Sequence, residues 1–197
     1  MKIIGITGGI GSGKSTISDY FKKKGYPMHD SDAVVSEIYK KPNNSFLKLL
    51  HSCGLKNIIK NKKINKKIIT NNFFVNKKIK NKIEKHIHKE VRLKREAFIK
   101  KNLNLKKNLI FLDIPLLLEN NLENQFDIVL CIMSTKANRV KRIMKNKKFS
   151  KEVLKKIFKN QTTDKERRLR SDIIITNNKS KKDFILASEK ALISILK

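Results

Sequence analysis

The feature that most constrains this chain is a glycine-rich stretch close to its N-terminus. Gly8–Ser15 has the sequence GGIGSGKS, which matches the phosphate-loop pattern G-x-x-x-x-G-K-[ST]. The apolar run Lys2–Thr7 precedes it, and Lys14–Lys24, which has helical spacing, follows it. Five of the seven glycines of the chain lie within the first thirteen residues. We therefore predict a strand, a tight turn and a helix, with the turn built to bind phosphate groups.

Each residue type in this loop has a physical reason. Glycines let backbone N–H groups approach phosphate oxygens, and the positive end of the following helix points at the anion. Lys14 is expected to reach the β- and γ-phosphates of ATP, and the hydroxyl of Ser15 to coordinate Mg²⁺. The other loop residues expected to contact ATP are Gly9, Gly11, Ser12, Gly13 and Thr16.

Beyond the loop, short apolar runs alternate with helical stretches. This alternation is typical of a parallel sheet that helices cover on both faces. We therefore predict an α/β fold of the P-loop NTPase type, a three-layer sandwich around a five-stranded parallel sheet. The strands are expected at Lys2–Thr7, Tyr26–Asp30, Asn108–Asp113, Asp127–Met133 and Asp172–Thr176, and the last helix at Lys181–Leu196.

Two long, basic intervals interrupt this alternation. The first has no convincing strand and contains Val75–Lys101, which has the pattern of one long helix. The second is also helical by pattern. We interpret them as a helical lobe and a helical lid inserted over the carboxyl edge of the sheet, where open α/β folds bind ligands. The chain is then one domain, 1–197, whose parts are a core at 1–32, 108–135 and 171–197, a substrate lobe at about 33–107 and a lid at about 136–170.

The charge balance is strongly basic, with 47 Lys and Arg against 17 Asp and Glu and a net charge of +30. Such a charge first suggests a polyanion partner. Lys, Asn and Ile are over-used together, however, as an A+T-rich coding sequence would produce, and no RNA- or DNA-binding motif accompanies them. We therefore expect no specific nucleic-acid partner, and expect the surplus charge to steer anionic substrates to the protein.

Targeting and redox signals are sparse. The N-terminus lacks the charged start and apolar stretch of a signal peptide, and no apolar run approaches the ~20 residues of a membrane span. Cys53 and Cys131 have neither metal-site nor disulfide-framework spacing. We therefore expect a cytoplasmic protein without membrane association, and a monomer or small homo-oligomer.

The phosphate loop alone does not select a reaction. The guanine-binding N-K-x-D and the D-x-x-G switch of GTPases are missing, and a chain under 200 residues with helical inserts favours a small-molecule kinase. Asp30 and Asp32 end the second expected strand, where one carboxylate could deprotonate an attacking hydroxyl and another order waters on Mg²⁺. One of them could instead cap the next helix. Asp113 likewise could hold Mg²⁺ through water or cap the residues that follow it.

Taken together, the motifs resemble those of the dephospho-coenzyme A kinase family. The resemblance covers most of the chain. It implies that the protein uses ATP to phosphorylate the ribose 3′-hydroxyl of dephospho-coenzyme A, with Asp32 as the base. It further implies that Asn177 lies near adenine. Among the arginines, Arg142 is a better candidate than Arg139 for a lid clamp on the transition-state charge, and Arg167 is the candidate for contact with ATP. The alternative for these arginines is a solvated basic face. The segments that carry the resemblance are Ile6–Thr16, Asp30–Asp32, Asp113–Glu119, Arg139 with Arg142, Gln161 with Arg167 and Asp172, and Asn177–Asn178.

Departures from that family's pattern include two in the inserts and Lys179, which follows Asn178 where the family commonly has glycine. His88-Lys89 stands where the family usually has His-Pro, and Asn146-Lys147 stands where its lid has Arg-Asp. Two other interpretations remain open at this point: another small-molecule or nucleotide kinase on the same scaffold, and a nucleic-acid-binding protein that holds ATP only as a ligand.

Overall fold

The computed structural model describes residues 1–55, 58–60, 63–64, 76–145 and 149–197. It divides into two compact units. The first consists of Met1–His29 together with Asn102–Lys197, and the second consists of Asp30–Lys101.

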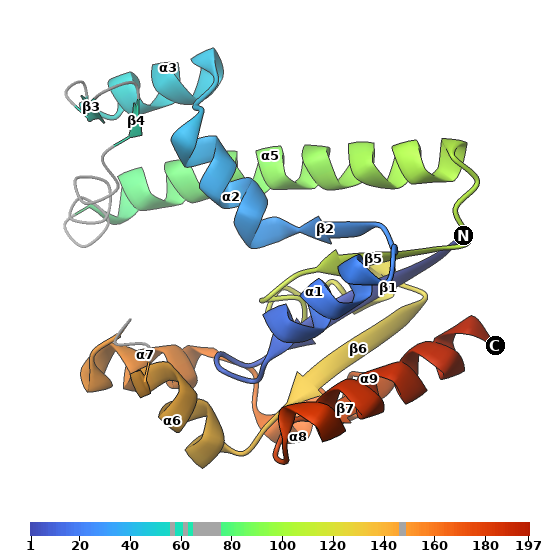
Figure 1. Ribbon diagram of the computed structural model, residues 1–197. Helices are drawn as coiled ribbons and strands as arrows, with labels where there is room; N and C mark the ends of the chain where they lie inside the picture. The colour runs from blue at the N-terminus through green and yellow to red at the C-terminus, as the bar shows by residue number, and fades with distance from the viewer. Residues whose placement is uncertain (56–57, 61–62, 65–75, 146–148) are drawn as a thin grey trace. The chain divides into compact units, whose positions relative to one another are not determined.

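The first unit is built on a parallel sheet of five strands (Figure 1). The strand order is β2-β5-β1-β6-β7, so β1 lies in the middle and pairs in parallel with both β5 and β6. The predicted α/β fold with a five-stranded parallel sheet is confirmed. The strands are β1 (Lys2–Gly8), β2 (Met28–Asp30), β5 (Leu109–Asp113), β6 (Ile128–Met133) and β7 (Ile173–Thr176).

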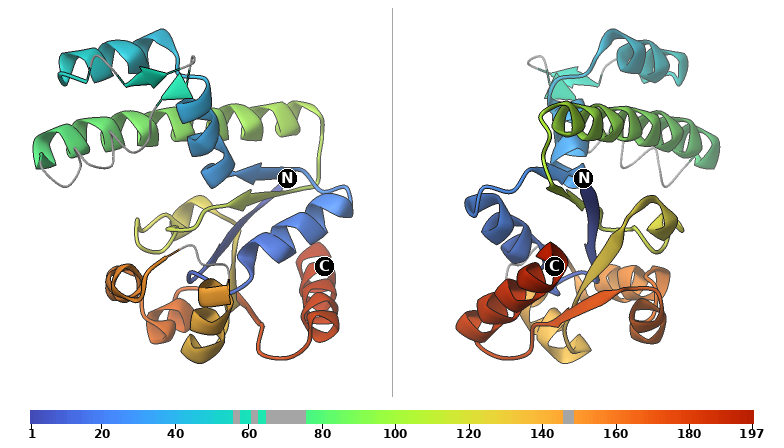
Figure 2. Two further views of the ribbon diagram at one scale, coloured as in Figure 1. Left: turned by 60° about the vertical axis from the view of Figure 1, so that its left-hand side comes forward. Right: turned by 90° about the vertical axis from the view of Figure 1, so that its right-hand side faces the viewer.

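One face of the sheet packs against helices α1 (Lys14–Lys23) and α9 (Lys181–Leu196), which lie on the same side of it (Figures 1 and 2). Helix α1 buries Ile17 and Phe21, as its helical spacing predicts. The ring of Phe21 stacks on that of Phe111 with 4.5 Å between the ring centres. Burial of such a side chain stabilises the fold by roughly 1.5–3 kcal/mol, so this contact anchors the helix that follows the phosphate loop.

On the opposite face of the sheet, helix α8 (Asp164–Leu169) contacts β6, and α8 is one of the helices in the interval of the predicted lid. The others are α6 (Lys136–Lys145) and α7 (Lys151–Asn160), and a short 3₁₀ helix, η1, spans Glu123–Gln125. On this face β1 has Gly5, where a Cβ would lie 2.6 Å from the Leu117 side chain. Thr163 caps α8 reciprocally with Glu166, which explains why the chain turns into a helix there.

The second unit is helical around its own core. Helices α2 (Ser31–Lys40), α3 (Asn44–Ser52) and α5 (Lys77–Asn104) contribute its apolar side chains, among them the fully buried Phe46, Leu50 and Ile83. The expectation that this interval holds no strand was wrong, because β3 (Ile59–Lys60) and β4 (Lys63–Ile64) form an antiparallel pair. Two-residue strands are too short to show a period of two in the sequence.

The long helix predicted in this interval is α5, although Val75 lies outside the described residues. Within the described ranges, none of the helices is both long and apolar enough to cross a membrane.

Candidate active site

The phosphate loop connects the end of β1 to the start of α1. Its turn is closed by hydrogen bonds from the Ser12 N–H to the Gly9 carbonyl and from the Thr16 N–H to the Gly13 carbonyl, each 3.0 Å long. Gly13 precedes the helix in a left-handed conformation with φ of 105°. A Cβ at that position would overlap the Asn177 amide nitrogen and lie 3.2 Å from the Phe184 ring, so both the conformation and the space require glycine.

Lys14, the first residue of α1, forms an ion pair with Asp113. Asp113 ends β5 and is only 3% exposed; its second oxygen accepts a 2.6 Å hydrogen bond from the Ser18 hydroxyl. Parallel pairing in register sets Asp113 beside Ile6 of β1, just before the loop. Both carboxylate oxygens are therefore engaged by the first helical turns after the loop, and the structure brings together Lys14 and Asp113, two residues singled out from the sequence. Ser15 directly follows Lys14 in the first turn of α1, and its side chain is exposed.

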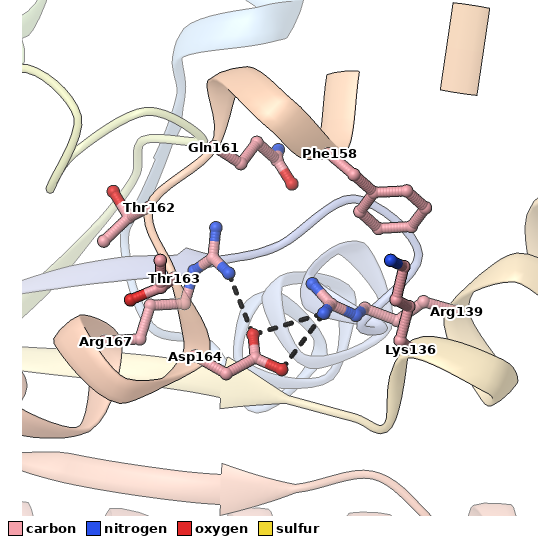
Figure 3. Close-up of a pocket in the computed structure, with 8 residues that line it drawn as sticks. All are labelled: Lys136, Arg139, Phe158, Gln161, Thr162, Thr163, Asp164 and Arg167. Atoms are coloured by element: carbon pink, nitrogen blue, oxygen red, sulfur yellow. Dashed lines mark hydrogen bonds and ion pairs between the residues drawn. The ribbon is translucent and has the colours of Figure 1, made fainter. Parts of the chain in front are cut away.

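A pocket of about 210 Å³ lies among the helices that follow β6 (Figure 3). Arg139 of α6 and Arg167 of α8 point toward one another across it, and Asp164 lies between them. The Asp164 carboxylate accepts hydrogen bonds of 3.1 and 3.2 Å from Arg139 and one of 3.1 Å from Arg167. Arg167 also contacts Glu119 at 3.3 Å. The pocket is lined by Lys136, Arg139, Phe158, Gln161, Thr162, Thr163, Asp164 and Arg167.

The two arginines lie against the phosphate loop. A Cβ at Gly9 would overlap a terminal nitrogen of Arg139 and lie 3.3 Å from one of Arg167. Gln161, which also lines the pocket, accepts a 3.1 Å hydrogen bond from the N–H of Ile10, so a second contact joins the pocket to the loop. The first residues of the loop therefore face two buried cations.

Burial lowers the pKa of the Arg139 guanidinium below its ordinary value, and the charge of Asp164 opposes that effect. The guanidinium remains a cation, because the arginine side chain is too basic to lose its proton in a protein. It also lies over the Phe158 ring at 5.2 Å, and Lys136 lies over the same ring at 5.6 Å. The charge of Arg139 is thus largely shielded from solvent, and there its interaction with an anion is stronger than in water.

Arg142 has different partners from Arg139, although the two residues are three apart on α6. Its guanidinium donates to the backbone carbonyls of Gly11 and Ser12 at 3.3 and 3.4 Å. It also donates to the Asn177 carbonyl at 2.8 Å and to the Asn177 side-chain oxygen at 3.1 Å. Asn177, 7% exposed, in turn donates to the Ser12 carbonyl at 2.7 Å. Both residues therefore contact the outside of the loop.

Asp30 and Asp32 belong to the second unit. Asp30 is the N-cap of α2, where its side chain accepts a 2.9 Å hydrogen bond from the N–H of Ala33. Asp32 lies in the first turn of the same helix, and its side chain is exposed. The alternative in which one of the pair caps this helix thus applies to Asp30.

The inserts also hold the departures noted from the sequence. His88 and Lys89 are exposed on α5, and Asn146 and Lys147 lie outside the described residues. Across the described part of the chain, no three His, Cys, Asp or Glu side chains are grouped so that they could hold a metal ion by themselves.

Three residues of the site were missed from the sequence. Asp164 joins the two arginines, Phe158 carries two cations on its ring, and Ser18 holds Asp113. Ser18 had a signal, because it lies four residues after Lys14 and shares its helix face. Asp164 stands inside a recognisable T-x-x-E capping box, which marks a helix start but gives no information about a distant arginine.

Comparison with known proteins gives a clear result. The family model for dephospho-CoA kinase matches residues 2–183, nearly the whole chain. This chain belongs to the dephospho-CoA kinase family. A dephospho-CoA kinase from Fusobacterium nucleatum is 33% identical to it over 190 residues, which are 95% of each protein.

Solved structures with a similar fold include one dephospho-CoA kinase. The dephospho-CoA kinase from Campylobacter jejuni superposes with a TM-score of 0.75 at 29% identity, covering 98% of this chain and 96% of that one. TT1252 from Thermus thermophilus superposes with a TM-score of 0.81 at 26% identity, covering 100% and 98%. The resemblance inferred from the sequence motifs is confirmed, and the chain is an ATP-dependent phosphotransferase.

Proposed function

We propose that this member of the dephospho-CoA kinase family transfers the terminal phosphoryl group of ATP to the ribose 3′-hydroxyl of dephospho-coenzyme A, with the triphosphate held between β1 and α1. The observation that carries this placement is the cluster at the start of α1, where Lys14 meets the buried Asp113 beside a glycine loop. A cation, a carboxylate and free helix-end amides are the groups that phosphoryl transfer needs.

The loop supplies the phosphate cradle. Backbone N–H groups of Gly11, Gly13 and their neighbours would surround the β-phosphate, and Thr16 lies within the same first turn. Lys14 would leave Asp113 and turn to the β- and γ-phosphates when ATP binds. That exchange conserves charge pairing, since the incoming phosphates replace the carboxylate as the partner of the ammonium group.

The residues present fit a magnesium ion bound together with ATP. Mg²⁺ prefers oxygen ligands and keeps several waters, so it needs few protein groups beyond the phosphates. Ser15 would offer its hydroxyl, and Asp113, once released by Lys14, would order water on the ion; Asp30 is a further candidate for that water-mediated role. When bound, the ion neutralises charge on the β- and γ-phosphates.

Arg139 and Arg167 are proposed to stabilise the transferred phosphoryl group. They are the buried cations that lie against Gly9, and charge that is held in place in a water-poor site stabilises a developing anion without reorganisation. Their shared partner, Asp164, is 44% exposed and so can yield its place to a phosphate. This assigns the transition-state clamp to Arg139 and Arg167, in place of Arg142.

Asp32 is proposed as the general base. Its carboxylate follows β2, a strand that ends at the carboxyl edge of the sheet, and it is exposed in the first turn of α2. A carboxylate in that role accepts the proton of the attacking 3′-hydroxyl and contributes about 10²–10⁴-fold to the rate.

The test is an assay of the purified protein with ATP, Mg²⁺ and dephospho-coenzyme A, following coenzyme A by chromatography. We expect the wild type to form coenzyme A, and Asp32→Asn to lower kcat by about 10²–10⁴-fold while the Kd for ATP stays unchanged. Asp19→Asn, an exposed Asp of α1, is the matched control. Full turnover by D32N would remove Asp32 from the base role, and absence of coenzyme A from the wild type would reject the proposed function.

A further inference from the structure

A bracket of polar groups, Arg142 with Asn177, holds the phosphate loop from its carbonyl side. Arg142 makes five hydrogen bonds: to the Gly11 carbonyl, the Ser12 carbonyl, the Ser134 hydroxyl, and the carbonyl and side-chain oxygens of Asn177. The amide nitrogen of Asn177 donates to the same Ser12 carbonyl at 2.7 Å. One backbone oxygen of the loop thus receives two side-chain donors, one of them charged.

The segments joined by this bracket are far apart in the sequence. Arg142 comes from α6, Ser134 follows β6, and Asn177 follows β7. The main chain at Asn177 is itself fixed, because its N–H donates to the Met133 carbonyl at 2.7 Å and its carbonyl accepts from the Ser134 hydroxyl at 2.8 Å. The bracket therefore ties the loop to the ends of strands β6 and β7.

The consequence for the loop follows from the planar peptide bond. The carbonyl of Ser12 and the N–H of Gly13 belong to one peptide plane and point in opposite directions. Donors that hold the Ser12 oxygen on the outside therefore turn the Gly13 N–H to the inside of the turn. A charged donor on that oxygen also polarises the peptide, which strengthens the hydrogen bond that its N–H gives to an anion.

We propose that Arg142, together with Asn177, is a positioning residue that orients the Ser12–Gly13 peptide for the phosphates of ATP, and that it acts through the loop without touching the nucleotide. The statement that this orientation serves ATP binding rests on the proposed function. The orientation itself is present in the ATP-free protein. It differs from the role proposed for Arg139 and Arg167, whose guanidiniums face the pocket.

The experiment compares wild type, Arg142→Ala, Arg142→Lys and Lys141→Ala. Lys141 is an exposed cation on the same helix and serves as the matched control. Backbone hydrogen exchange of the peptide that covers Gly11–Lys14 is measured by mass spectrometry in the ATP-free protein. The same proteins are assayed for kcat and for the KM of ATP, with and without added methylguanidinium.

We expect R142A to exchange its loop amides at least about tenfold faster than wild type before any ATP is added, and to raise the KM for ATP by about tenfold or more, as loss of hydrogen bonds to a charged group does. The value of kcat should change less than KM. Methylguanidinium should restore both loop protection and KM, whereas R142K should restore them only in part, because an ammonium group cannot reach both carbonyls and Asn177 together. K141A should match wild type.

Two outcomes would overturn the inference. If R142A has wild-type exchange rates but a raised KM for ATP, Arg142 contacts the nucleotide itself. If both the exchange rates and the KM for ATP are unchanged in R142A, Arg142 does not position the loop. If R142A fails to fold, R142K must show the same direction in exchange, and wild-type exchange in R142K would count against the bracket. Failure of the wild type to make coenzyme A would reject the proposed function, yet leave the exchange result as it stands.

Discussion

Replacing Asp164 with Asn tests how strongly one carboxylate holds the two buried arginines. The substitution keeps the shape of the side chain and removes its charge. Asp164 accepts three hydrogen bonds from Arg139 and Arg167, whose side chains are 7% and 4% exposed. In D164N the guanidinium of Arg139 loses its ion pair while it remains buried.

The expected magnitude follows from burial and from the remaining partners. Breaking a fully buried ion pair costs about 3–5 kcal/mol. Two features lower that value here, because Asp164 is 44% exposed and Arg167 keeps Glu119 at 3.3 Å. Loss of a negative charge from the first residue of α8 adds about 0.3–1 kcal/mol. We therefore expect the free energy of unfolding to fall by about 2 kcal/mol.

The assay is urea denaturation followed by circular dichroism, with D19N as the control for an Asp-to-Asn change at an exposed site. Inorganic phosphate is then titrated into D164N and into the wild type. An anion in the pocket would replace the missing carboxylate, and a bound ligand at 100 times its Kd stabilises by about 2.7 kcal/mol. Phosphate should thus stabilise D164N more than wild type. A D164N protein as stable as D19N would refute the ion-pair reasoning, and equal stabilisation of both proteins by phosphate would refute the idea that a phosphate takes the place of Asp164.

Two further predictions concern the loop and the core. Gly13→Ala should abolish ATP binding and lower the free energy of unfolding by at least about 2 kcal/mol, because it combines a left-handed φ of 105° with overlap on Asn177. Gly25→Ala is the control: it has φ of 88° with nothing within 4 Å, so it should show only the backbone cost of about 1–2 kcal/mol. Equal losses of stability in the two variants, measured by calorimetry, would contradict the overlap. Burial raises the pKa of the Cys131 thiol from 9.0 to about 11, so the stability that its neutral form contributes is complete below pH 9 and is lost as the pH rises through 11. At pH 8, iodoacetamide should label Cys53 and spare Cys131 until urea is added, and equal labelling of both cysteines in the native protein would count against this burial.

The sequence by itself determined the scaffold and the family. A glycine loop between an apolar run and an amphipathic helix has few structural solutions, and the strand pattern predicted each of the five parallel strands to within two residues at either end. The reason is that these signals are local: periodicity, capping residues and glycine conformation act over a few neighbouring residues. The motifs that resembled the dephospho-CoA kinase family were also local, and the comparisons confirmed the family.

Only the tertiary structure decided which side chains meet. Arg139 and Arg142 lie three apart on one helix, yet one contacts Asp164 and the other the loop carbonyls, because long side chains select partners from whichever segments pack on either side. The pairing of Lys14 with Asp113 spans 99 positions and depends on β5 lying next to β1. Such contacts arise from strand order and packing, which no short stretch of sequence encodes, and they are what turn a phosphate-loop motif into a particular site.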